Sequence, residues 1–406
     1  MNKNINKIFI ITFFLIMILS KGFNVYANED IAVDGKAALI VETHNGKIIY
    51  EKNADEIIFP ASLTKILTAI IVLENCNLDD VAIVSKNAIS NIPTGYVVAP
   101  LYEGEKIKVK DLLYALLLES ANDAAYVLAE HVGNSVEEFS NIMNKKAQEI
   151  GCKNTHFINP NGIHNENHYT TAYDLYLISN YAMKNDTFSK IVSTYQYTLP
   201  DTNKYSKKDR VMTNRNYFVN PNSKFYNKNV NGIKTGTTTE AGNCVITNVK
   251  KDELEIITII LGAETYNSRF SETKKMIEYA FENYAYAKLH EKGDIIKKIE
   301  VKNATEDTKN LNLAISEDIT VIKNVKTNIS EIEPEIILNE NISAPIEEGQ
   351  ELGTVKYNVD GIEYTAKLIA EKNVELRTYY KEILIVIGTI MIIVILFKRS
   401  RKKFNK

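Results

Sequence analysis

The sequence predicts a mixed α/β (α+β) protein: one antiparallel sheet packed with helices, followed by a small all-β module. Three observations predict this. Strand patterns lie at both ends of the region before residue 285, helical patterns fill its middle, and short alternating runs dominate beyond residue 290. The chain has 406 residues, which is room for two or three domains. Its content of 45% hydrophobic and 24% charged residues is that of a globular protein.

The first region begins with a hairpin at Ala37–Tyr50, whose two strands flank an Asn45-Gly46 turn. Helical periodicity then predicts four segments, at Leu63–Glu74, Asp111–Val132, Val136–Ile150 and Thr171–Met183. Two strands, Asn243–Lys250 and Glu253–Leu261, and a helix from Ser268 to about Tyr284 complete the region. We expect its first and last strands to be neighbours in one sheet.

Beyond residue 290 the chain predicts a β-rich module of roughly 80 residues. The predicted strands are Ile295–Val301, Leu311–Ile315, Ile319–Val325, Glu335–Leu338, Val355–Val359 and Ile362–Leu368. The last two flank Asp360-Gly361, a type I′ turn signal. Nothing in this module indicates catalysis, so we expect it to act as a spacer.

The first 27 residues are typical of a secretory signal. Lys3 and Lys7 precede an apolar run at Ile8–Leu19, and small residues before Asn28 predict cleavage after Ala27. A retained anchor helix is the alternative, but a run of about 12 residues is short for one. We therefore expect the body of the protein to lie outside the cytoplasm.

A second apolar run, Ile383–Phe397, lies near the other end. Counted from Tyr379 to Lys398, we expect it to form a single membrane-spanning anchor, because a basic cluster of Lys and Arg follows it. The alternative of an apolar core helix is disfavoured, because nothing follows the run for it to pack on. An interfacial helix is also disfavoured, because the run has no polar face.

Charge and cysteine content exclude further classes. The net charge is −3, so the basic excess of a nucleic-acid-binding protein is absent. The three cysteines, Cys76, Cys152 and Cys244, are too few for a disulfide scaffold and lack metal-ligand spacing. We expect them to be small buried residues, although an odd number of thiols outside the cell leaves this open.

Pro60-Ala61-Ser62-Leu63-Thr64-Lys65 is the first motif that suggests chemistry. Ser62 is placed at a helix start, where free N–H groups favour a developing negative charge. Lys65 lies three residues on, on the same face, and a lysine with a lowered pKa can take the serine proton. The spacing alone equally fits a helix cap beside a surface lysine.

Two further motifs are ambiguous when taken singly. Ser120-Ala121-Asn122 follows an apolar run and can aim two polar side chains into one cleft, but it also fits a turn or a cap. Lys234-Thr235-Gly236-Thr237 precedes a strand, and its glycine allows a substrate backbone to approach closely. The same residues are common in an exposed edge strand.

In this order, however, the three motifs resemble those of the penicillin-recognising serine enzymes. The surrounding residues are similar to those of the D-alanyl-D-alanine carboxypeptidases, the low-molecular-mass penicillin-binding proteins. The similar residues lie in five segments: 60–65, Asn159–Gly162, His168–Leu175, Leu261–Ala263 and Arg269-Phe270. Because that family often adds a small β domain and a C-terminal membrane anchor, the resemblance covers essentially the whole chain.

The resemblance implies a division into five parts: a signal peptide (1–27), a serine DD-peptidase domain (28–288), a β-rich domain (289–375), a transmembrane anchor (379–398) and a basic cytoplasmic tail (399–406). It also implies cell-wall peptidoglycan with pentapeptide stems as substrate and β-lactams as covalent inhibitors. No metal or cofactor is implied.

The same resemblance assigns roles to residues. Ser62 attacks the carbonyl of the penultimate D-alanine, Lys65 takes its proton, and Ser120 relays a proton to the leaving amine. The N–H groups of Ser62 and Thr237 form the oxyanion hole. The remaining implied substrate-binding residues are Asn122 for the substrate amide, Lys234, Thr235 and Arg269 for charge and the terminal carboxylate, and Gly236 for close approach.

Three other functions remain open at this stage. A serine β-lactamase of the same superfamily is the nearest, but the glutamate pattern that activates water in class A enzymes is not found between Ser120 and Lys234. An inactive peptidoglycan-binding surface protein would not need three intact motifs. Endopeptidase or transpeptidase activity would share the acyl-enzyme and differ only in the bond cut or the acceptor.

Overall fold

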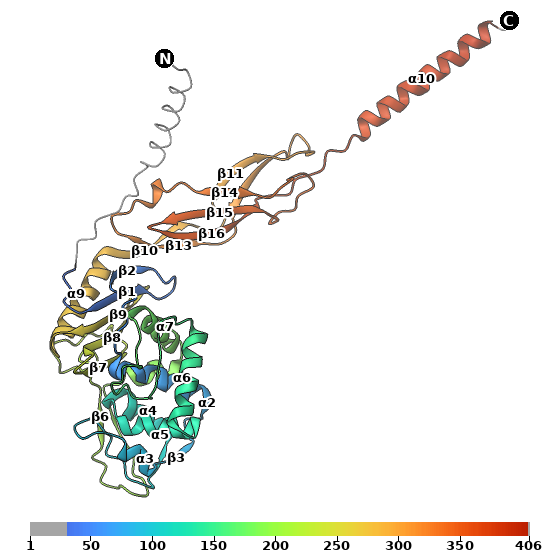
Figure 1. Cartoon of the computed structure of the whole chain (residues 1–406). Helices are drawn as coiled ribbons and strands as arrows, with labels where there is room; N and C mark the ends of the chain where they lie inside the picture. The colour runs from blue at the N-terminus through green and yellow to red at the C-terminus, as the bar shows by residue number, and fades with distance from the viewer. Residues whose placement is uncertain (1–30, 405–406) are drawn as a thin grey trace, which may run out of the picture.

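The computed structural model describes residues 31–404, and the expected signal segment (1–27) lies outside them. Two bodies follow one another along the chain, and a separate helix lies at its end (Figure 1). The first body is built on a five-stranded antiparallel sheet in the order β2-β1-β9-β8-β7. Its strands are β1 (Ala37–Glu42), β2 (Ile48–Lys52), β7 (Lys234–Thr238), β8 (Gly242–Lys251) and β9 (Leu254–Ala263).

The predicted hairpin and the predicted neighbours are confirmed. Strand β1 pairs with β2 on one side and with β9 on the other, with Leu39 opposite Ile259. Alternate residues of these strands face opposite sides of the sheet, as period-2 patterning requires. Leu39 belongs to the core on the helix-rich side, whereas Ile40 belongs to the core beneath α9 (Ser268–Asn283).

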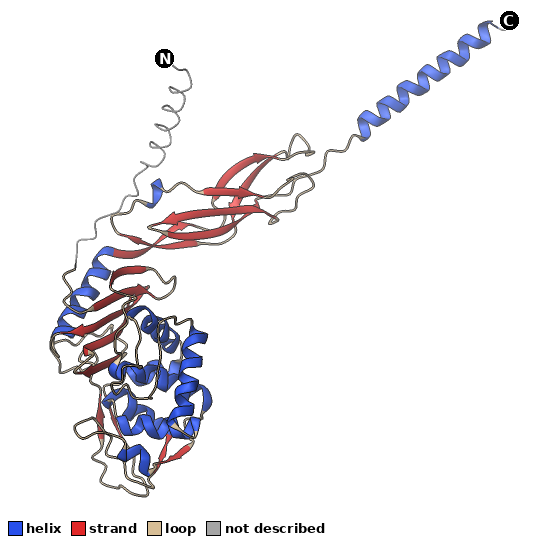
Figure 2. Ribbon diagram, viewed as in Figure 1, coloured by secondary structure: helices blue, strands red, loops and turns tan. Residues whose placement is uncertain are grey.

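Most helices of the first body pack on the side of the sheet away from α9 (Figure 2). They are α2 (Lys65–Asn75), α3 (Lys86–Ser90), α4 (Val109–Tyr114), α5 (Asn122–Gly133), α6 (Val136–Ile150), α7 (Ala172–Met183) and α8 (Asp186–Val192). Helices α6 and α7 match their predicted ranges, each with a side-chain N-cap, Ser135 and Thr171. Sequence patterning did not predict α3, α8 or the short pairs β3 (Val81–Ile83)–β4 (Lys106–Lys108) and β5 (Gln196–Thr198)–β6 (Val211–Thr213).

Two predicted helices are interrupted at functional positions. The predicted Leu63–Glu74 helix begins with a 3₁₀ turn, η1 (Ala61–Thr64). The predicted Asp111–Val132 helix is two helices, because the π-helical turn Ala115–Glu119 ends at Ser120 in the left-handed conformation, with φ 67°. Such π turns occur often at functional sites.

The second body is the predicted β module. It contains the sheet β11-β12-β16-β15-β14 and the pair β10-β13 around a core of its own. The strands are β10 (Tyr284–His290), β11 (Ile295–Glu300), β12 (Asn310–Ile315), β13 (Ile319–Asn324), β14 (Glu335–Leu338), β15 (Glu351–Val359) and β16 (Ile362–Ala370). The short 3₁₀ helix η3 (Ile329–Glu331) lies between β13 and β14. Tyr286 Oη donates to Glu42 (2.8 Å) and Lys47 Nζ to the Asp360 carbonyl (2.6 Å), which joins the two bodies.

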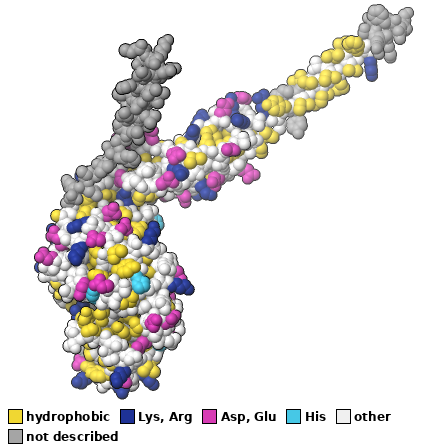
Figure 3. Space-filling model, viewed as in Figure 1, with side chains coloured by type: hydrophobic (Ala, Val, Ile, Leu, Met, Phe, Trp, Pro, Cys, Tyr) yellow, Lys and Arg dark blue, Asp and Glu magenta, His cyan; other side chains and the backbone are white. Residues whose placement is uncertain are grey.

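Helix α10 (Tyr380–Phe404) extends beyond the β module, and apolar side chains cover much of it (Figure 3). Within residues 31–404, no helix has both the length and the apolar content needed to cross a membrane. The expectation of a spanning helix at 379–398 is therefore not supported. The apolar run Ile383–Phe397 has 15 residues, about 22 Å of helix against a hydrocarbon core of about 30 Å.

Candidate active site

The predicted nucleophile, Ser62, lies in the 3₁₀ turn before α2, and a neighbouring loop fixes that turn. Ala61 has a left-handed backbone (φ 47°), and its carbonyl accepts a hydrogen bond from Thr64 Oγ1 at 2.8 Å. Gly162 packs so closely that a Cβ on it would lie 1.8 Å from the same carbonyl oxygen. Only a residue without a side chain fits there, so the 159–162 loop holds Ser62 in place.

Lys65 is the first residue of α2, and its ammonium group is completely buried beside Ser62. Nζ donates to Ser62 Oγ at 2.9 Å, to Asn122 Oδ1 at 2.9 Å and to the Asn161 carbonyl at 2.7 Å. Each of the three partners comes from a different segment. The three bonds fix Nζ in hydrogen-bonding range of the serine oxygen, which is the geometry a general base needs.

The electrostatics of the site favour a neutral Lys65. Burial holds its pKa well below the usual range, and the positive charges of Lys234 and Arg215 lower it further, while Asp123 opposes them. The charge of Lys234 thus contributes to the lowered pKa of Lys65, although burial is the larger cause. In the neutral form, Lys65 keeps two N–H donors, for Asn122 and Asn161, and its lone pair can accept the proton of Ser62.

Ser120 and Asn122 enter the site because the helix breaks between them. Ser120 follows the π turn, and Asn122 begins α5. The Asn122 amide accepts from Lys65 through Oδ1 and donates through Nδ2 to the Val97 carbonyl at 2.9 Å. The nearby Asp123 carboxylate accepts from the N–H groups of Ala99 and Leu101, which fixes the 97–101 loop along the cleft.

The third motif forms edge strand β7, which approaches the nucleophile closely. A Cβ on Gly236 would lie 3.0 Å from the Ser62 backbone nitrogen and 3.2 Å from Ala61 Cβ. Glycine is therefore required where β7 passes the nucleophile turn. This contact brings residues 62 and 236 together across more than 170 residues of sequence, as the convergence of the motifs requires.

Two buried cations lie along β7. Lys234 donates from Nζ to the Thr235 carbonyl at 3.0 Å, and burial, with Arg215 and Arg269 nearby, lowers its pKa to about 7. The family resemblance also implies that Lys234 orients Ser120, but within residues 31–404 no hydrogen bond joins these two side chains. The Arg269 guanidinium donates to Thr237 Oγ1 at 3.0 Å and to the Gly236 carbonyl at 3.1 Å, so it positions β7.

Ser62 opens into two adjoining cavities. One, of about 170 Å³, is lined by predicted site residues together with three others: Ser62, Val97, Ser120, Arg215, Thr235, Gly236, Thr237, Tyr266 and Arg269. The other, of about 520 Å³, extends between the 94–97 loop, Asn122, the 161–163 loop and residues 237–239. Lys65 and Lys234 lie behind these walls. Seven of the nine predicted residues thus line these cavities, whereas Lys65 reaches the site through Ser62 and Lys234 begins the strand that borders it.

Sequence reasoning missed Arg215, whose guanidinium pairs with Glu119 (Nη2 to Oε1, 2.6 Å) at the mouth of the smaller cavity. It also missed Asn161 as the third acceptor for Lys65. No local pattern marks Arg215, whereas Asn161 lies in the family-similar segment Asn159–Gly162, to which no role was assigned. The Ser-x-x-Lys spacing occurs a second time, at Ser271–Lys274, but there the lysine is exposed and pairs with Glu278.

This fold places a serine hydroxyl 2.9 Å from the amine of a buried lysine in one cleft, an arrangement suited to serine acyl transfer. Residues 24–265 match the family model described as D-alanyl-D-alanine carboxypeptidase, and residues 284–376 match that of the penicillin-binding protein 5 C-terminal domain. The chain therefore belongs to the D-alanyl-D-alanine carboxypeptidase family and is a serine-type D-Ala-D-Ala carboxypeptidase of the cell wall.

Relatives of known name agree. D-alanyl-D-alanine carboxypeptidase DacF of Bacillus subtilis is 34% identical over 357 residues, with 85% of this chain and 88% of the relative covered. DacC of Escherichia coli is 29% identical, with 85% of each covered. The crystal structure of DacD from Francisella tularensis superimposes with a TM-score of 0.67 at 27% identity, covering 89% of this chain and 98% of that one.

Proposed function

We propose that the enzyme removes the terminal D-alanine from peptidoglycan pentapeptide stems through an acyl-enzyme on Ser62. The observation that carries this proposal is the 2.9 Å contact between Lys65 Nζ and Ser62 Oγ, with the lysine pKa lowered by burial. Lys65 takes the serine proton as Oγ attacks the carbonyl of the penultimate D-alanine.

The oxyanion formed in this attack is held by the N–H groups of Ser62 and Thr237. The close approach of Gly236 to the Ser62 nitrogen supports this assignment. One such donor contributes about 3 kcal/mol to stabilising the transition state. Ser120 passes a proton to the leaving D-alanine amine, and water then releases the acyl group.

Substrate selection depends on the positive charge along β7. Lys234 and Thr235 bind the terminal carboxylate, the group that distinguishes a carboxypeptidase substrate, and Asn122 bonds the substrate amide. Arg269 acts by positioning Gly236 and Thr237, because its hydrogen bonds go to these residues. A β-lactam carries a carbonyl and a carboxylate in a similar arrangement and acylates Ser62 as an inhibitor.

The test is hydrolysis of a pentapeptide ending in D-Ala-D-Ala by the purified full chain. We expect release of one D-alanine per peptide, lost in Ser62→Ala. Fast turnover of penicillin without release of D-alanine would instead identify a β-lactamase. Penicillin labelling and D-alanine release that both survive in Ser62→Ala would remove the nucleophile from the mechanism.

The domain boundaries and location follow as part of the same proposal. The catalytic domain is 28–288, the β-rich domain 289–375 is a spacer, and the enzyme works outside the cytoplasm. Exposed apolar side chains along α10, such as Ile385 and Phe397, support attachment of the protein to the membrane through this helix. After cell fractionation we expect the full chain in the membrane fraction and a chain ending at residue 378 outside it.

A further inference from the structure

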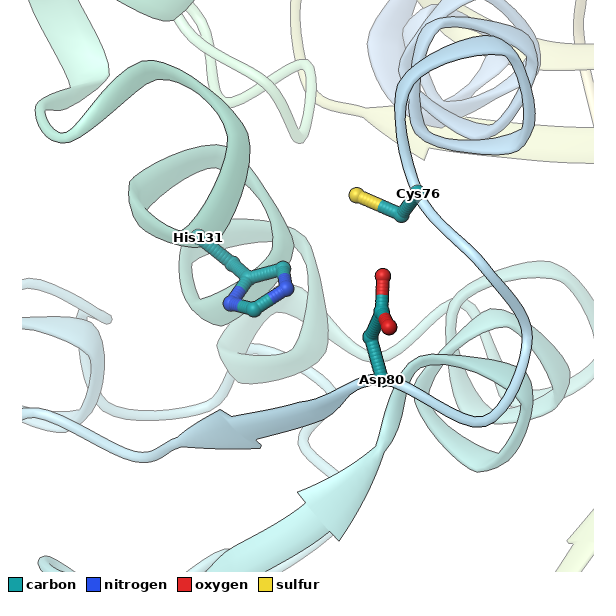
Figure 4. A group of neighbouring side chains, drawn as sticks. All are labelled: Cys76, Asp80 and His131. Carbon is teal, nitrogen blue, oxygen red and sulfur yellow. The ribbon is translucent and has the colours of Figure 1, made fainter.

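Three side chains with metal-binding atoms meet on the far side of the catalytic helices. Within residues 31–404, Cys76, Asp80 and His131 form the one such group, and their ligand atoms all lie within 4.8 Å of one another. The three side chains point toward a common space (Figure 4). Cys76 follows the last residue of α2, Asp80 directly precedes β3, and His131 lies in the last turn of α5.

The cluster is more than a group of neighbouring surface residues, because its carboxylate is already oriented. Asp80 Oδ2 accepts a hydrogen bond from the Asn77 backbone N–H at 2.8 Å, and the Asp80 N–H donates to the Asn77 carbonyl at 3.1 Å. The short loop between α2 and β3 is thereby closed into a turn. Hydrogen bonds of this kind fix the direction of a metal ligand before the metal arrives.

We propose that Cys76, Asp80 and His131 bind one Zn²⁺ ion, which links the end of α2 to the end of α5. A thiolate, an imidazole and a carboxylate are the ligand types that Zn²⁺ takes, and a thiolate disfavours Mg²⁺ and Ca²⁺. Three protein ligands leave one tetrahedral position for water. Residue spacing could not reveal the site, because His131 is distant along the chain from the other two ligands.

The geometry requires only a small contraction. With bonds of 2.0–2.3 Å at the tetrahedral angle, two ligand atoms of one Zn²⁺ lie about 3.3–3.8 Å apart. The ligand atoms of these three side chains now lie within 4.8 Å of one another, so they must approach each other only slightly. The His131 side chain is exposed and can rotate to close this difference. Burial, and then the charge of Asp80, raise the pKa of the Cys76 thiol, so the sulfur is protonated without metal. Binding forms the S–Zn bond and releases that proton to solvent.

The position of the ion indicates what it does. Helices α2 and α5 begin with Lys65 and Asn122, which are joined at 2.9 Å in the active site. Cys76 directly follows the last residue of α2, and His131 lies in the last turn of α5. With 11 and 12 residues, the helices are about 16 and 18 Å long. The Zn²⁺ ion would therefore fix the two catalytic helices at the ends opposite the nucleophile, as a structural site outside the reaction.

The first test uses Co²⁺ as the probe, because a cobalt–thiolate bond gives an ultraviolet charge-transfer band. The full chain is stripped with a chelator and titrated with Co²⁺ alone. We expect a band that saturates at one Co²⁺ per chain and vanishes in Cys76→Ser. In His131→Ala, Co²⁺ should bind with an affinity at least about tenfold lower. Cys152→Ser is the matched control: this half-buried thiol faces the Asp174 carbonyl and should leave the band unchanged.

The second test is thermal unfolding, which keeps the proposal falsifiable if Cys76→Ser fails to fold. At a hundredfold excess over Kd, Zn²⁺ should raise the Tm of the wild type by roughly 5 °C, and Mg²⁺ should not. His131→Ala changes an exposed side chain and should fold normally but lose this rise. Absence of a cobalt band in the wild type, a band retained in Cys76→Ser, or an equal Tm rise in His131→Ala would overturn the proposal.

Discussion

Replacing Asn122 by Asp tests the protonation state of Lys65 directly. The substitution keeps the size of the side chain and puts a negative charge where Oδ1 now accepts from Lys65 Nζ at 2.9 Å. A carboxylate there stabilises the ammonium form of Lys65, and an ammonium group cannot take the proton of Ser62. The protein should therefore fold and bind but acylate slowly at neutral pH.

The distance sets the size of the effect. Two unit charges 2.9 Å apart attract each other by about 6 kcal/mol at an effective dielectric constant of 20. Desolvation of the new carboxylate offsets part of this attraction. If about 3 kcal/mol remains, the pKa of Lys65 rises by about two units, and its neutral fraction, and with it the acylation rate, falls by up to about a hundredfold.

The assay is the rate of acylation by a fluorescent penicillin across the pH range. For Asn122→Asp we expect a loss that is largest at acid to neutral pH and shrinks as the pH rises, because alkaline solution deprotonates Lys65 again. Asn122→Leu is the control, since it removes the acceptor without adding charge. It should slow acylation by a factor that does not change with pH. Wild-type rates in Asn122→Asp at neutral pH would refute the role of Lys65 as neutral base.

Three further predictions concern other parts of the molecule. Because the pKa of Lys234 is lowered to about 7, its charge is lost above that pH, so kcat/KM for the pentapeptide should fall there. Arginine keeps its charge to higher pH, so Lys234→Arg should move this alkaline loss upward. An unchanged pH profile would contradict the role of Lys234 in binding the substrate carboxylate. Gly236→Ala places a Cβ 3.0 Å from the Ser62 nitrogen and should slow acylation by about 10²–10³-fold with Tm lowered only slightly, whereas unchanged acylation would remove the need for glycine. In the wild type the buried Arg210 pairs with Glu105 at 2.7 Å, and Glu105→Gln leaves its charge uncompensated. Chemical denaturation should then show the free energy of unfolding lowered by about 3 kcal/mol, and a loss under 1 kcal/mol would show the pair to be unimportant.

Sequence patterns predicted those features that depend on local periodicity or a known motif order. The hairpin at Ala37–Tyr50 and helix α6 follow from turn residues and apolar spacing. Eight of the nine expected site residues follow from the order of the motifs, and Arg269 from the wider family resemblance. The π turn before Ser120 could not be predicted, because Leu112–Leu118 is equally suited to a continuous helix. Tertiary packing alone decides where that helix breaks.

The electrostatic part of the site also depends on distant contacts. Arg215 influences both catalytic lysines from a loop that carries no motif, and Asn161 contributes only its backbone carbonyl. The cysteines were expected to be buried, which holds for Cys244, whereas Cys76 and Cys152 are half-buried. The partial exposure of Cys76 follows from its place at the end of α2, outside the core.

The central claim is that Ser62 carries the acyl group, and peptide mapping tests it most directly. The full chain is incubated with penicillin, quenched and digested, and the modified peptide is sequenced by mass spectrometry. The account predicts one penicilloyl group per chain, on Ser62, and none on Ser62→Ala. A penicilloyl group on Ser120 or elsewhere, or no adduct on folded wild-type protein, would contradict it.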